Sequence, residues 1–380
     1  MGDTRSKPQF IGSEIYRTST YGGRHPLAIP RVSTCIDLCR ALGWLPDAVY
    51  HDSPKAEPEA LARFHAPDYV AALIDAEASQ SAPAALRERH NFGCNGNPIF
   101  PEIFSRPATA AGGTLLAARL LQEAKQERPI VYSPAGGTHH GRPDRASGFC
   151  YLNDPVLGLL ALLDGGLERV LYLDVDAHHA DGVQDAFAED LRVLTVSLHE
   201  AGRWPMQAES ETGTAADRAG GSARNLPLPP HFNDEELDFL LEAAILPLAV
   251  SFEPQAIMLQ CGADALSDDP MSKLGLSNGA LWRVVAAMRD LGRPLIVLGG
   301  GGYNPWSVGR CWTGVWAMLN GYALPDRLPA EAEAVLRRLT WRHRQGRQPP
   351  EHWFSTLADA PRRGPIRAEI RNLAAEVLAP

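Results

Sequence analysis

The sequence predicts an α/β fold, in which helices cover both faces of a mostly parallel sheet. Short apolar runs of strand length alternate along the chain with longer segments that have the composition of helices. The apolar runs are continuous, without alternating polar residues, which is typical of parallel strands buried on both faces. The chain has 380 residues, 45% of them hydrophobic, so it is long enough for a large core and too apolar to be disordered.

The expected elements follow from these apolar runs and from segments rich in Ala and Leu. Strands are predicted at residues 130–132, 170–173, 193–196, 257–259 and 295–298. Helices are predicted at residues 34–43, 56–78, 108–126, 155–164, 234–252 and 278–291. The C-terminal part, 329–380, is predicted to be helical with breaks at its prolines. Pro and Gly are dispersed along the chain, which favours many loops on one large scaffold.

The charge balance argues against several classes of partner. The chain has 36 Lys and Arg residues and 45 Asp and Glu residues, a formal net charge of −9. A general DNA-binding or anionic-membrane-binding protein needs a basic surface, so neither nucleic acid nor a membrane is expected as a partner. The first ten residues are polar and have no apolar stretch of a secretory signal, so a cytoplasmic location is expected. The six cysteines form no C-x-x-C pair and are expected to be reduced and mostly buried.

Polar and glycine-rich segments follow all five predicted strands, at the point where each strand ends. In open parallel sheets, functional sites form outside the carboxyl ends of the strands. A functional site is therefore predicted at this edge of the sheet. The five segments are GGTHH at 136–140, DVDAHH at 174–179, SLHE at 197–200, CGAD at 261–264 and GGGGY at 299–303.

A metal site is predicted from the acids and the imidazole in these segments. Asp174, Asp176 and His178 are spaced by two, so an extended chain directs all three to one side. Asp264 comes from another strand end. Oxygen and nitrogen ligands without a thiolate suit Zn²⁺, Fe²⁺ or Mn²⁺. Any one of these residues alone would more simply cap a loop or satisfy a core hydrogen bond, but the set favours a metal.

The adjacent histidines His139 and His140 are candidates for proton transfer. One could act as the base on a metal-bound water while the other protonates a leaving group. Each would need a carboxylate to orient its ring and tune its pKa, and Asp174 and Asp181 are the candidates. The alternative for either histidine is a satisfied core residue.

Tyr303 follows four glycines, an arrangement that lets the backbone approach a ligand closely. A phenol presented in this way would stabilise a developing oxyanion on a carbonyl oxygen. A dinucleotide-binding G-x-G-x-x-G loop is excluded by spacing, because Asn304 and Pro305 stand where its last glycine would be. A tight turn with a core tyrosine remains the alternative.

Five segments together resemble the histone deacetylase family, in particular the bacterial histone-deacetylase-like proteins and the acetoin-utilisation deacetylase branch. They are HPLAIPRVS at 25–33, AGGTHHGRPDRASGFCYLND at 135–154, LYLDVDAHHADGVQDAF at 171–187, LQCGADALSDD at 259–269 and LGGGGYNPWSVGRCWT at 298–313. The resemblance implies one arginase/deacetylase-type domain over residues 1–380. Its core motifs would span 25–316, and the helical segment 329–380 would pack on them.

The resemblance also assigns site residues. It implies Zn²⁺, with Fe²⁺ as a possible substitute, on Asp176, His178 and Asp264. It implies a catalytic set made of His139, His140, Asp174, Asp181 and Tyr303. It implies a structural K⁺ near Asp174, Asp176, His178, Ser197 and Leu198. The acyl-lysine tunnel maps to Gly148, Phe149 and Met271, and Arg31 maps to an internal channel behind the metal.

The implied activity is zinc-dependent hydrolysis of acetyl-lysine, or a related acyl-lysine, in proteins or peptides to acetate and a free amine. The alternative is an amidohydrolase of small acetylated amines such as acetylpolyamines. A manganese ureohydrolase is disfavoured because residues 260–264 lack an acid two positions before Asp264. A non-enzymatic scaffold is disfavoured because all the chemical positions are present. The oligomeric state stays open.

The sequence departs from the family pattern at the mouth of the implied tunnel. After His199, family members often have a second tunnel aromatic and a Pro-Gly-Thr-Gly turn, and Trp204 is the predicted substitute aromatic. Residues 93–97 lack the rim acid of many eukaryotic relatives. Glu209 and Glu211 could supply acids for a polyamine substrate. These departures leave the substrate open, and they leave the reaction unaffected.

Overall fold

The computed structural model describes residues 7–19, 21–23, 25–94, 96–124, 128–207 and 210–379. Its described residues form an eight-stranded sheet with the order β2-β1-β3-β8-β7-β4-β5-β6. Every pairing in this sheet is parallel, so the predicted α/β class is confirmed. The strands are β1 (Gln9–Gly12), β2 (Tyr50–Asp52), β3 (Ile130–Ser133), β4 (Val170–Asp174), β5 (Val193–Glu200), β6 (Ala223–Leu228), β7 (Ala256–Gln260) and β8 (Leu295–Leu298).

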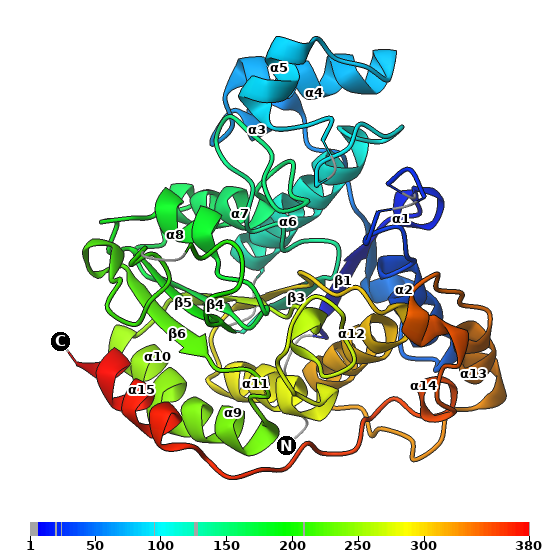
Figure 1. Ribbon diagram of the computed structural model, residues 1–380, viewed down its shortest axis with the longest axis vertical. Coiled ribbons are helices and arrows are strands. Elements are labelled where there is room, and N and C mark those ends of the chain that lie inside the picture. The colour runs from blue at the N-terminus through cyan, green and yellow to red at the C-terminus, as the bar shows by residue number, and fades with distance from the viewer. Residues whose placement is uncertain are drawn as a thin grey trace.

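Helices connect the strands and cover both faces of the sheet (Figure 1). In the first half of the chain they are α1 (Ile15–Thr18), α2 (Val32–Ala41), α3 (Pro58–Leu61), α4 (Pro67–Ser79), α5 (Ala84–His90), α6 (Ser105–Glu123), α7 (Asp154–Asp164) and α8 (Asp181–Ala186). In the second half they are α9 (Asp234–Leu240), α10 (Leu246–Phe252), α11 (Asn278–Asp290), α12 (Pro305–Asn320), α13 (Ala330–Arg337), α14 (His352–Ser355) and α15 (Ala368–Leu378). No helix among the described residues is long and apolar enough to cross a membrane.

Successive strand residues enter two separate cores, one on each face of the sheet. On β8, Leu295 and Val297 belong to the core that contains α2, α11 and α12. Ile296 and Leu298 belong to the core that contains α6 and α7. This alternation follows from the period of two in a strand. Both faces are apolar because both are covered, which is why the sequence shows continuous apolar runs.

Three strands were not predicted from the sequence. β1 and β2 are short, and β2 reads Tyr-His-Asp with little apolar content. β6 contains Arg224, Asn225 and Pro227. It lies at the edge of the sheet, where proline is tolerated although it has no N–H to donate to a neighbouring strand. β2 and β6 are the two edge strands and are buried less completely than the central strands, so they carry a weaker apolar signal, whereas β1 was missed because it is short.

Two of the predicted helices are interrupted, and four helices, α1, α5, α8 and α12, were not predicted. The segment 56–78 forms α3 and α4 instead of one helix, because Pro67 disfavours helical backbone at the residue before it. The segment 234–252 contains a π turn at Leu241–Ile245 between α9 and α10. α12 was not predicted from its tryptophans, although Asn304 caps its N-terminus and Pro305 occupies its first turn.

The C-terminal helices contribute to the same core as the sheet. Leu336 of α13, Trp353 of α14 and Ile370 of α15 are buried in the cluster that contains α12. The Trp306 indole stacks on Trp353 at 5.3 Å and donates a hydrogen bond to the Leu336 carbonyl at 2.9 Å. Figure 1 shows α15 lying beside α9, at the β6 side of the molecule. The segment after residue 329 thus covers one face of the fold.

Candidate active site

The N-terminus of α7 fixes the turn that carries the two candidate histidines. The Asp154 carboxylate accepts hydrogen bonds from Gly137 N at 3.0 Å and Thr138 N at 2.8 Å. It also accepts from the Thr138 and Thr114 hydroxyls. Gly137 has a φ of +99°, and a Cβ there would lie 2.7 Å from the backbone nitrogen of Gly300, so this turn requires glycine. The turn is therefore held by backbone atoms and by one buried acid.

Asn153 ties the same turn to the helix from the other side. Its side-chain oxygen accepts from Val156 N at 3.1 Å, as a residue at a helix N-cap does. Its amide nitrogen donates to the carbonyls of His139 at 3.0 Å and Gly141 at 2.9 Å. The backbone around His140 is thus fixed by the cap of α7.

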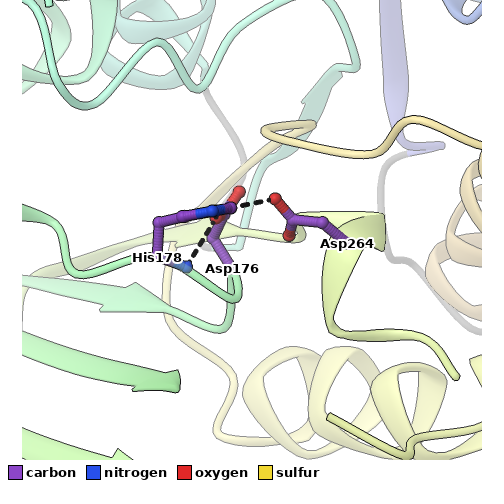
Figure 2. Close-up of side chains that lie close together, drawn as sticks. All are labelled: Asp176, His178 and Asp264. Carbon is purple, nitrogen blue, oxygen red and sulfur yellow. Dashed lines mark hydrogen bonds and ion pairs between the residues drawn. The ribbon is translucent and has the colours of Figure 1, made fainter. Parts of the chain in front are cut away.

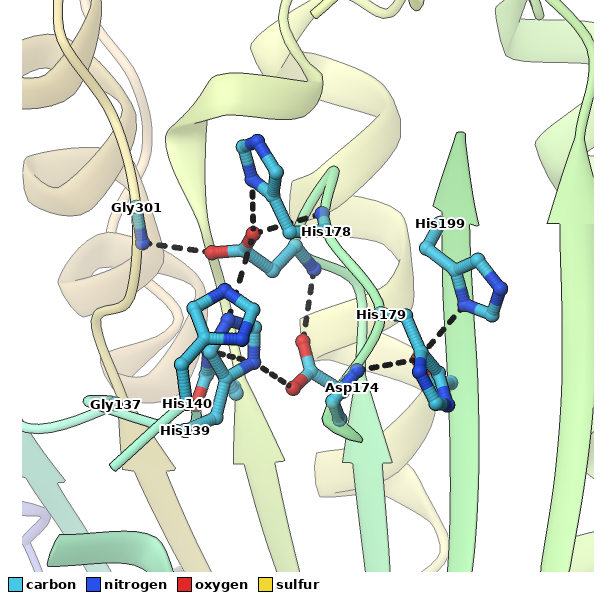
Figure 3. Close-up of polar contacts among 12 residues, drawn as sticks. Gly137, His139, His140, Asp174, His178, His179, His199 and Gly301 are labelled. Atoms are coloured by element: carbon cyan, nitrogen blue, oxygen red, sulfur yellow. Dashed lines mark hydrogen bonds and ion pairs between the residues drawn. The ribbon is translucent and has the colours of Figure 1, made fainter. Parts of the chain in front are cut away.

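Each histidine faces the carboxylate that the sequence assigned to it. Figure 3 shows His139 beside Asp174. His139 Nδ1 lies 2.7 Å from Asp174 Oδ2, and His140 Nδ1 lies 2.6 Å from Asp181 Oδ1. The two imidazole rings are 4.0 Å apart between centroids. All four side chains are buried. In each pair the carboxylate orients the ring and leaves Nε2 free to face the cavity.

Similar partners nevertheless give the two histidines opposite pKa shifts. Burial lowers the pKa of His139, but the carboxylates of Asp174 and Asp176 outweigh it and raise this pKa to about 9. Burial and the neighbouring His139 lower the pKa of His140 to about 4, despite the opposing effect of Asp181. The pair therefore combines one protonated and one neutral imidazole at pH 7.

Asp176, His178 and Asp264 form a compact, buried cluster of potential metal ligands (Figure 2). Their ligand atoms all lie within 4.8 Å of one another. His178 Nδ1 is 3.2 Å from Asp176 Oδ1 and 3.1 Å from Asp264 Oδ2. Asp176 and His178 lie on the loop after β4, and Asp264 lies on a short 3₁₀ turn after β7. The loop after β4 and the turn after β7 meet because β4 and β7 are neighbours in the sheet.

The donor set fits a divalent cation. Burial tends to raise the pKa of Asp176, but His139 and His178 outweigh it and lower this pKa. Burial and the charge of Asp176 raise the pKa of Asp264. A cation between two buried carboxylates this close compensates the repulsion between their negative charges. Two oxygen ligands and one imidazole match a zinc site that keeps a position open for substrate.

Glycines let the backbone approach this cluster. A Cβ on Gly301 would lie 2.0 Å from Asp264 Oδ2, and one on Gly262 would lie 2.2 Å from Asp176 Oδ2. Gly301 N instead donates to Asp176 Oδ2 at 2.7 Å. Glycine at both positions therefore preserves the space and the hydrogen bonding around the ligands.

Tyr303 lies on the same glycine-rich loop and faces the same space. Its backbone nitrogen donates to Asp269 Oδ2 at 2.6 Å, which fixes the residue at the end of the loop. The ring is 6.0 Å from that of Phe149, and both side chains line the pocket together with His140 and His178. Burial and the charge of Asp264 raise the pKa of Tyr303 well above its ordinary value, so its hydroxyl stays protonated and can donate.

The residues assigned to a structural K⁺ come from neighbouring segments. Asp174 of β4 and Ser197 of β5 are paired in register. Asp176 N donates to Asp174 Oδ1 at 2.9 Å, and Ser197 Oγ lies 2.9 Å from His199 Nδ1. Leu198, the next residue of β5, is buried. These five predicted positions, His178 among them, lie around the end of β4.

A pocket of about 790 Å³ leads from the surface to the cluster. Phe149, Trp204 and Met271 line it, with Trp204 half-exposed. The Trp204 ring lies 4.7 Å from the His140 ring. A Cβ on Gly148 would lie 2.3 Å from the tip of the Trp204 indole, so this wall requires glycine opposite the tryptophan. The predicted tunnel residues are thus brought together around the histidines.

Arg31 lines a smaller cavity of about 40 Å³ behind the cluster. Its guanidinium donates to the Gly300 carbonyl at 2.7 Å and lies 5.2 Å from the Trp312 ring centroid. Its Nε has no hydrogen-bond partner among the described residues. Asn95 and Glu209, which sequence analysis considered for the pocket rim, lie outside the described residues.

Sequence reasoning missed three polar residues that support the histidine pair. Tyr172 Oη lies 2.7 Å from Asp174 Oδ2 and 2.8 Å from Gln260 Oε1. Gln260 Nε2 in turn lies 2.9 Å from His139 Nδ1. Arg142 forms an ion pair with Asp181. For Tyr172 and Gln260 the available signal was a polar residue inside or at the end of an otherwise apolar strand, which a reading of apolar runs passes over.

Comparison with known proteins identifies the class of this fold and site. The histone deacetylase domain model matches residues 25–319. The chain is 36% identical over 315 residues to putative histone deacetylase 2 of Caenorhabditis elegans. This match covers 81% of this chain and 61% of that protein. It is 34% identical over 310 residues to histone deacetylase 8 of Xenopus tropicalis, which covers 79% of this chain and 81% of that protein.

Solved structures extend the match to nearly the whole chain. The crystal structure of an HDAC homolog from Aquifex aeolicus has a TM-score of 0.91 and 34% identity, and it covers 98% of this chain and 100% of that chain. The structure of an HDAC homolog complexed with SAHA gives the same values. The chain therefore belongs to the histone deacetylase family. The predicted resemblance and the single arginase/deacetylase-type fold are both confirmed.

Proposed function

We propose that this protein is a zinc-dependent deacylase that hydrolyses the amide of acetyl-lysine, or a related acyl-lysine, in proteins or peptides. The observation that carries the proposal is the meeting of two buried His–Asp pairs and a buried Asp-His-Asp cluster. One residue of each group type, His140 and His178, lines one pocket together with Tyr303. Membership of the histone deacetylase family supports amide hydrolysis, and the HDAC homolog complexed with SAHA supports a ligand resembling acyl-lysine.

Asp176, His178 and Asp264 would hold Zn²⁺, with Fe²⁺ as the alternative metal. The bound metal would acidify a water molecule and polarise the amide carbonyl. The five residues assigned to K⁺, Asp174 among them, would bind it as a structural ion. Metal content of the purified protein distinguishes these ions by element.

The chain's own groups supply the proton transfers. His140 is neutral at pH 7 and accepts the proton of the attacking water, with Asp181 orienting its ring. His139 stays protonated beside Asp174 and keeps a positive charge next to the developing negative charge. The Tyr303 hydroxyl donates a hydrogen bond to the carbonyl oxygen as it becomes negative.

The reaction balances with one water molecule. A bond forms between the water oxygen and the acyl carbon, and the bond between the acyl carbon and the lysine nitrogen breaks. The imidazole of His140, which took its proton from the water, returns that proton to the departing amine. The products are acetate and a free amine. Phe149 and Trp204 line the pocket on the path of the lysine side chain and exclude water from it.

Acetate release from the zinc-loaded protein tests this function. An acetyl-lysine peptide and acetylputrescine are assayed side by side, each with and without a chelator. Release from the peptide that the chelator abolishes is the expected result. Release from acetylputrescine alone would contradict the acyl-lysine assignment, and release from neither would contradict the deacylase function.

A matched pair of variants controls for folding. Asp264→Ala is expected to lose both zinc and acetate release, because one of the three ligands is missing. Asp290→Ala removes an exposed carboxylate on α11 and is expected to keep both. Stoichiometric zinc in Asp264→Ala would show that the metal lies elsewhere.

A further inference from the structure

The mouth of the pocket carries an unusual distribution of charge. One wall is formed by Glu200 at the end of β5 and by Arg203 and Trp204 in the segment that follows, together with Met271 and Lys273. Among the described residues that line the pocket, Glu200 is the one acid, whereas Arg203 and Lys273 are cations. The formal charge of this rim is positive on a chain whose net charge is −9.

Glu200 is already engaged within the protein. Its side chain is 4% exposed, so it offers little surface to a ligand. It forms an ion pair with the Arg203 guanidinium, with Nη2 lying 3.0 Å from Oε1. Its Oε2 also accepts from the backbone nitrogen of Lys273 at 2.8 Å. A substrate amine would have to displace these partners to use this carboxylate.

Lys273, in contrast, is exposed and has no carboxylate within ion-pair distance among the described residues. Its backbone is fixed on both sides, since its nitrogen donates to Glu200 and its carbonyl accepts from His231 N at 2.7 Å. The adjacent Ser272 hydroxyl donates to the carbonyl of Asp264 at 2.5 Å. A rigid backbone therefore presents this ammonium group at the pocket mouth.

The opposite wall adds no formal charge among its described residues. Asn97 donates to the Asn91 carbonyl at 2.9 Å and accepts from Phe149 N at 3.0 Å. The Asn91 side chain donates to the Ala146 carbonyl at 2.8 Å. Both amides are used to hold the wall together. The balance of charge at the mouth is thus decided by Lys273.

On the basis of the deacylase function above, we propose that the pocket mouth selects acyl-lysine substrates with acidic neighbouring residues, and that Lys273 determines this selectivity. An Asp or Glu close to the acyl-lysine would approach the exposed ammonium group as the side chain enters the pocket. An acetylpolyamine carries protonated amines instead, which the same charge repels. The proposed substrate is therefore an acylated lysine in an acidic peptide.

Three peptides with the same acetyl-lysine and with Glu, Gln or Lys on both sides test the selectivity. One exposed ion pair is worth about a threefold change in kcat/KM. Because attraction is replaced by repulsion, we expect kcat/KM for the Glu peptide to exceed that for the Lys peptide about tenfold at low salt. The ratio should shrink as salt is raised, because exposed charges are screened.

Two variants assign the effect to Lys273. Lys273→Glu should reverse the order of the Glu and Lys peptides, and Lys273→Gln should bring their ratio close to one. The control is Lys55→Glu, which changes the net charge equally at an exposed lysine that does not line the pocket. It should keep the wild-type ratio.

The outcomes separate the two proposals. If the three peptides are hydrolysed at equal rates, or if Lys273→Glu keeps the wild-type order, the selectivity is wrong and the deacylase function stands. If none of the three peptides, including the Gln peptide, releases acetate, the deacylase function fails and the selectivity with it. If Lys55→Glu shifts the ratio as much as Lys273→Glu, the effect belongs to net charge and the role of Lys273 is overturned.

Discussion

The floor and the mouth of the pocket are built in different ways. The floor consists of side chains at the ends of β3, β4, β7 and β8, each buried and held by hydrogen bonds within the scaffold. The mouth includes Trp204, which is 49% exposed, and Lys273, whose side chain is exposed although its backbone is fixed. The sheet therefore sets the chemistry, and the segments after its strands set which molecule reaches that chemistry.

Removing the Tyr303 hydroxyl should cause the largest loss at the floor. Tyr303→Phe is expected to lower kcat about 10²- to 10³-fold with little change in KM, because the lost hydrogen bond forms chiefly as negative charge develops. Steady-state kinetics measures this, and zinc content should stay stoichiometric. Tyr21→Phe is the control, since Tyr21 lines the smaller cavity beside Arg31 and has no proposed role in the reaction. A near-normal kcat in Tyr303→Phe would remove this residue from the mechanism.

Asp181→Asn should break the positioning of His140. The variant is expected to lower kcat about 10²-fold, within the range of general acid–base contributions. It should also lower the pKa of His140 further below about 4, because Asp181 is a group that raises it. Histidine titration by NMR measures the pKa. An unchanged pKa together with full activity would show that Asp181 neither orients nor charges this ring.

The free energy of unfolding should depend on pH through His65, a buried histidine that supports the N-terminus of α7. Burial lowers the pKa of His65 to about 4, and its Nε2 accepts from Asn153 N at 3.0 Å. Because this folded-state pKa lies below the ordinary value near 6.5, the unfolded state binds the proton more readily. The stabilisation is present above pH 6.5 and is lost as the pH falls towards 4. We expect a decrease of about 3 kcal/mol in the free energy of unfolding.

Denaturant unfolding at several pH values measures this decrease. A His65→Gln variant keeps hydrogen-bonding capacity but cannot titrate, so it should show a smaller decrease between pH 6.5 and 4. His51, whose ring is partly buried at β2 and far along the sheet order from β4, serves as the control in His51→Gln. Equal pH dependence in wild type and His65→Gln would contradict the role of His65.

The smallest effect is expected at the mouth. Trp204→Ala should raise KM about three- to tenfold and leave kcat within a factor of about three, because an exposed wall contributes apolar contact to binding without taking part in the reaction. Trp204→Phe should restore most of the affinity. If Trp204→Ala lowered kcat as strongly as Asp181→Asn, the distinction between mouth and floor would fail, and the ring contact with His140 would be part of the chemistry.

The floor could be predicted from the sequence because its residues stand in short contiguous segments at strand ends. The spacing of Asp174, Asp176 and His178 is local, and β4, β5 and β7 were recognisable as apolar runs. Gln260 could not be assigned, since its contact with His139 depends on the order of strands in the sheet. Tyr172 lies two residues before Asp174 on the same strand and was passed over because it stands in an apolar run.

The mouth could not be predicted in the same way. The charge balance at Lys273 depends on the ion pair of Glu200 and Arg203, and the position of its backbone depends on Glu200 and His231. These residues meet Lys273 only in the folded chain. Likewise, β6 was missed because Arg224 and Pro227 are typical of loops. Both residues are tolerated in this strand because it lies at the edge of the sheet. Long-range pairing therefore limited both the fold and the site.

The cap of α7 has a practical consequence. Asn153 and Asp154 hold the turn through backbone atoms of Gly137, Thr138 and His139, and among the described residues neither forms a hydrogen bond with the imidazole of His140. The turn should therefore keep its shape when that imidazole is deleted. A His140→Ala protein would then accept an acylated peptide without cleaving it, and could serve as a bait to retrieve the natural substrates of this protein from cell extracts.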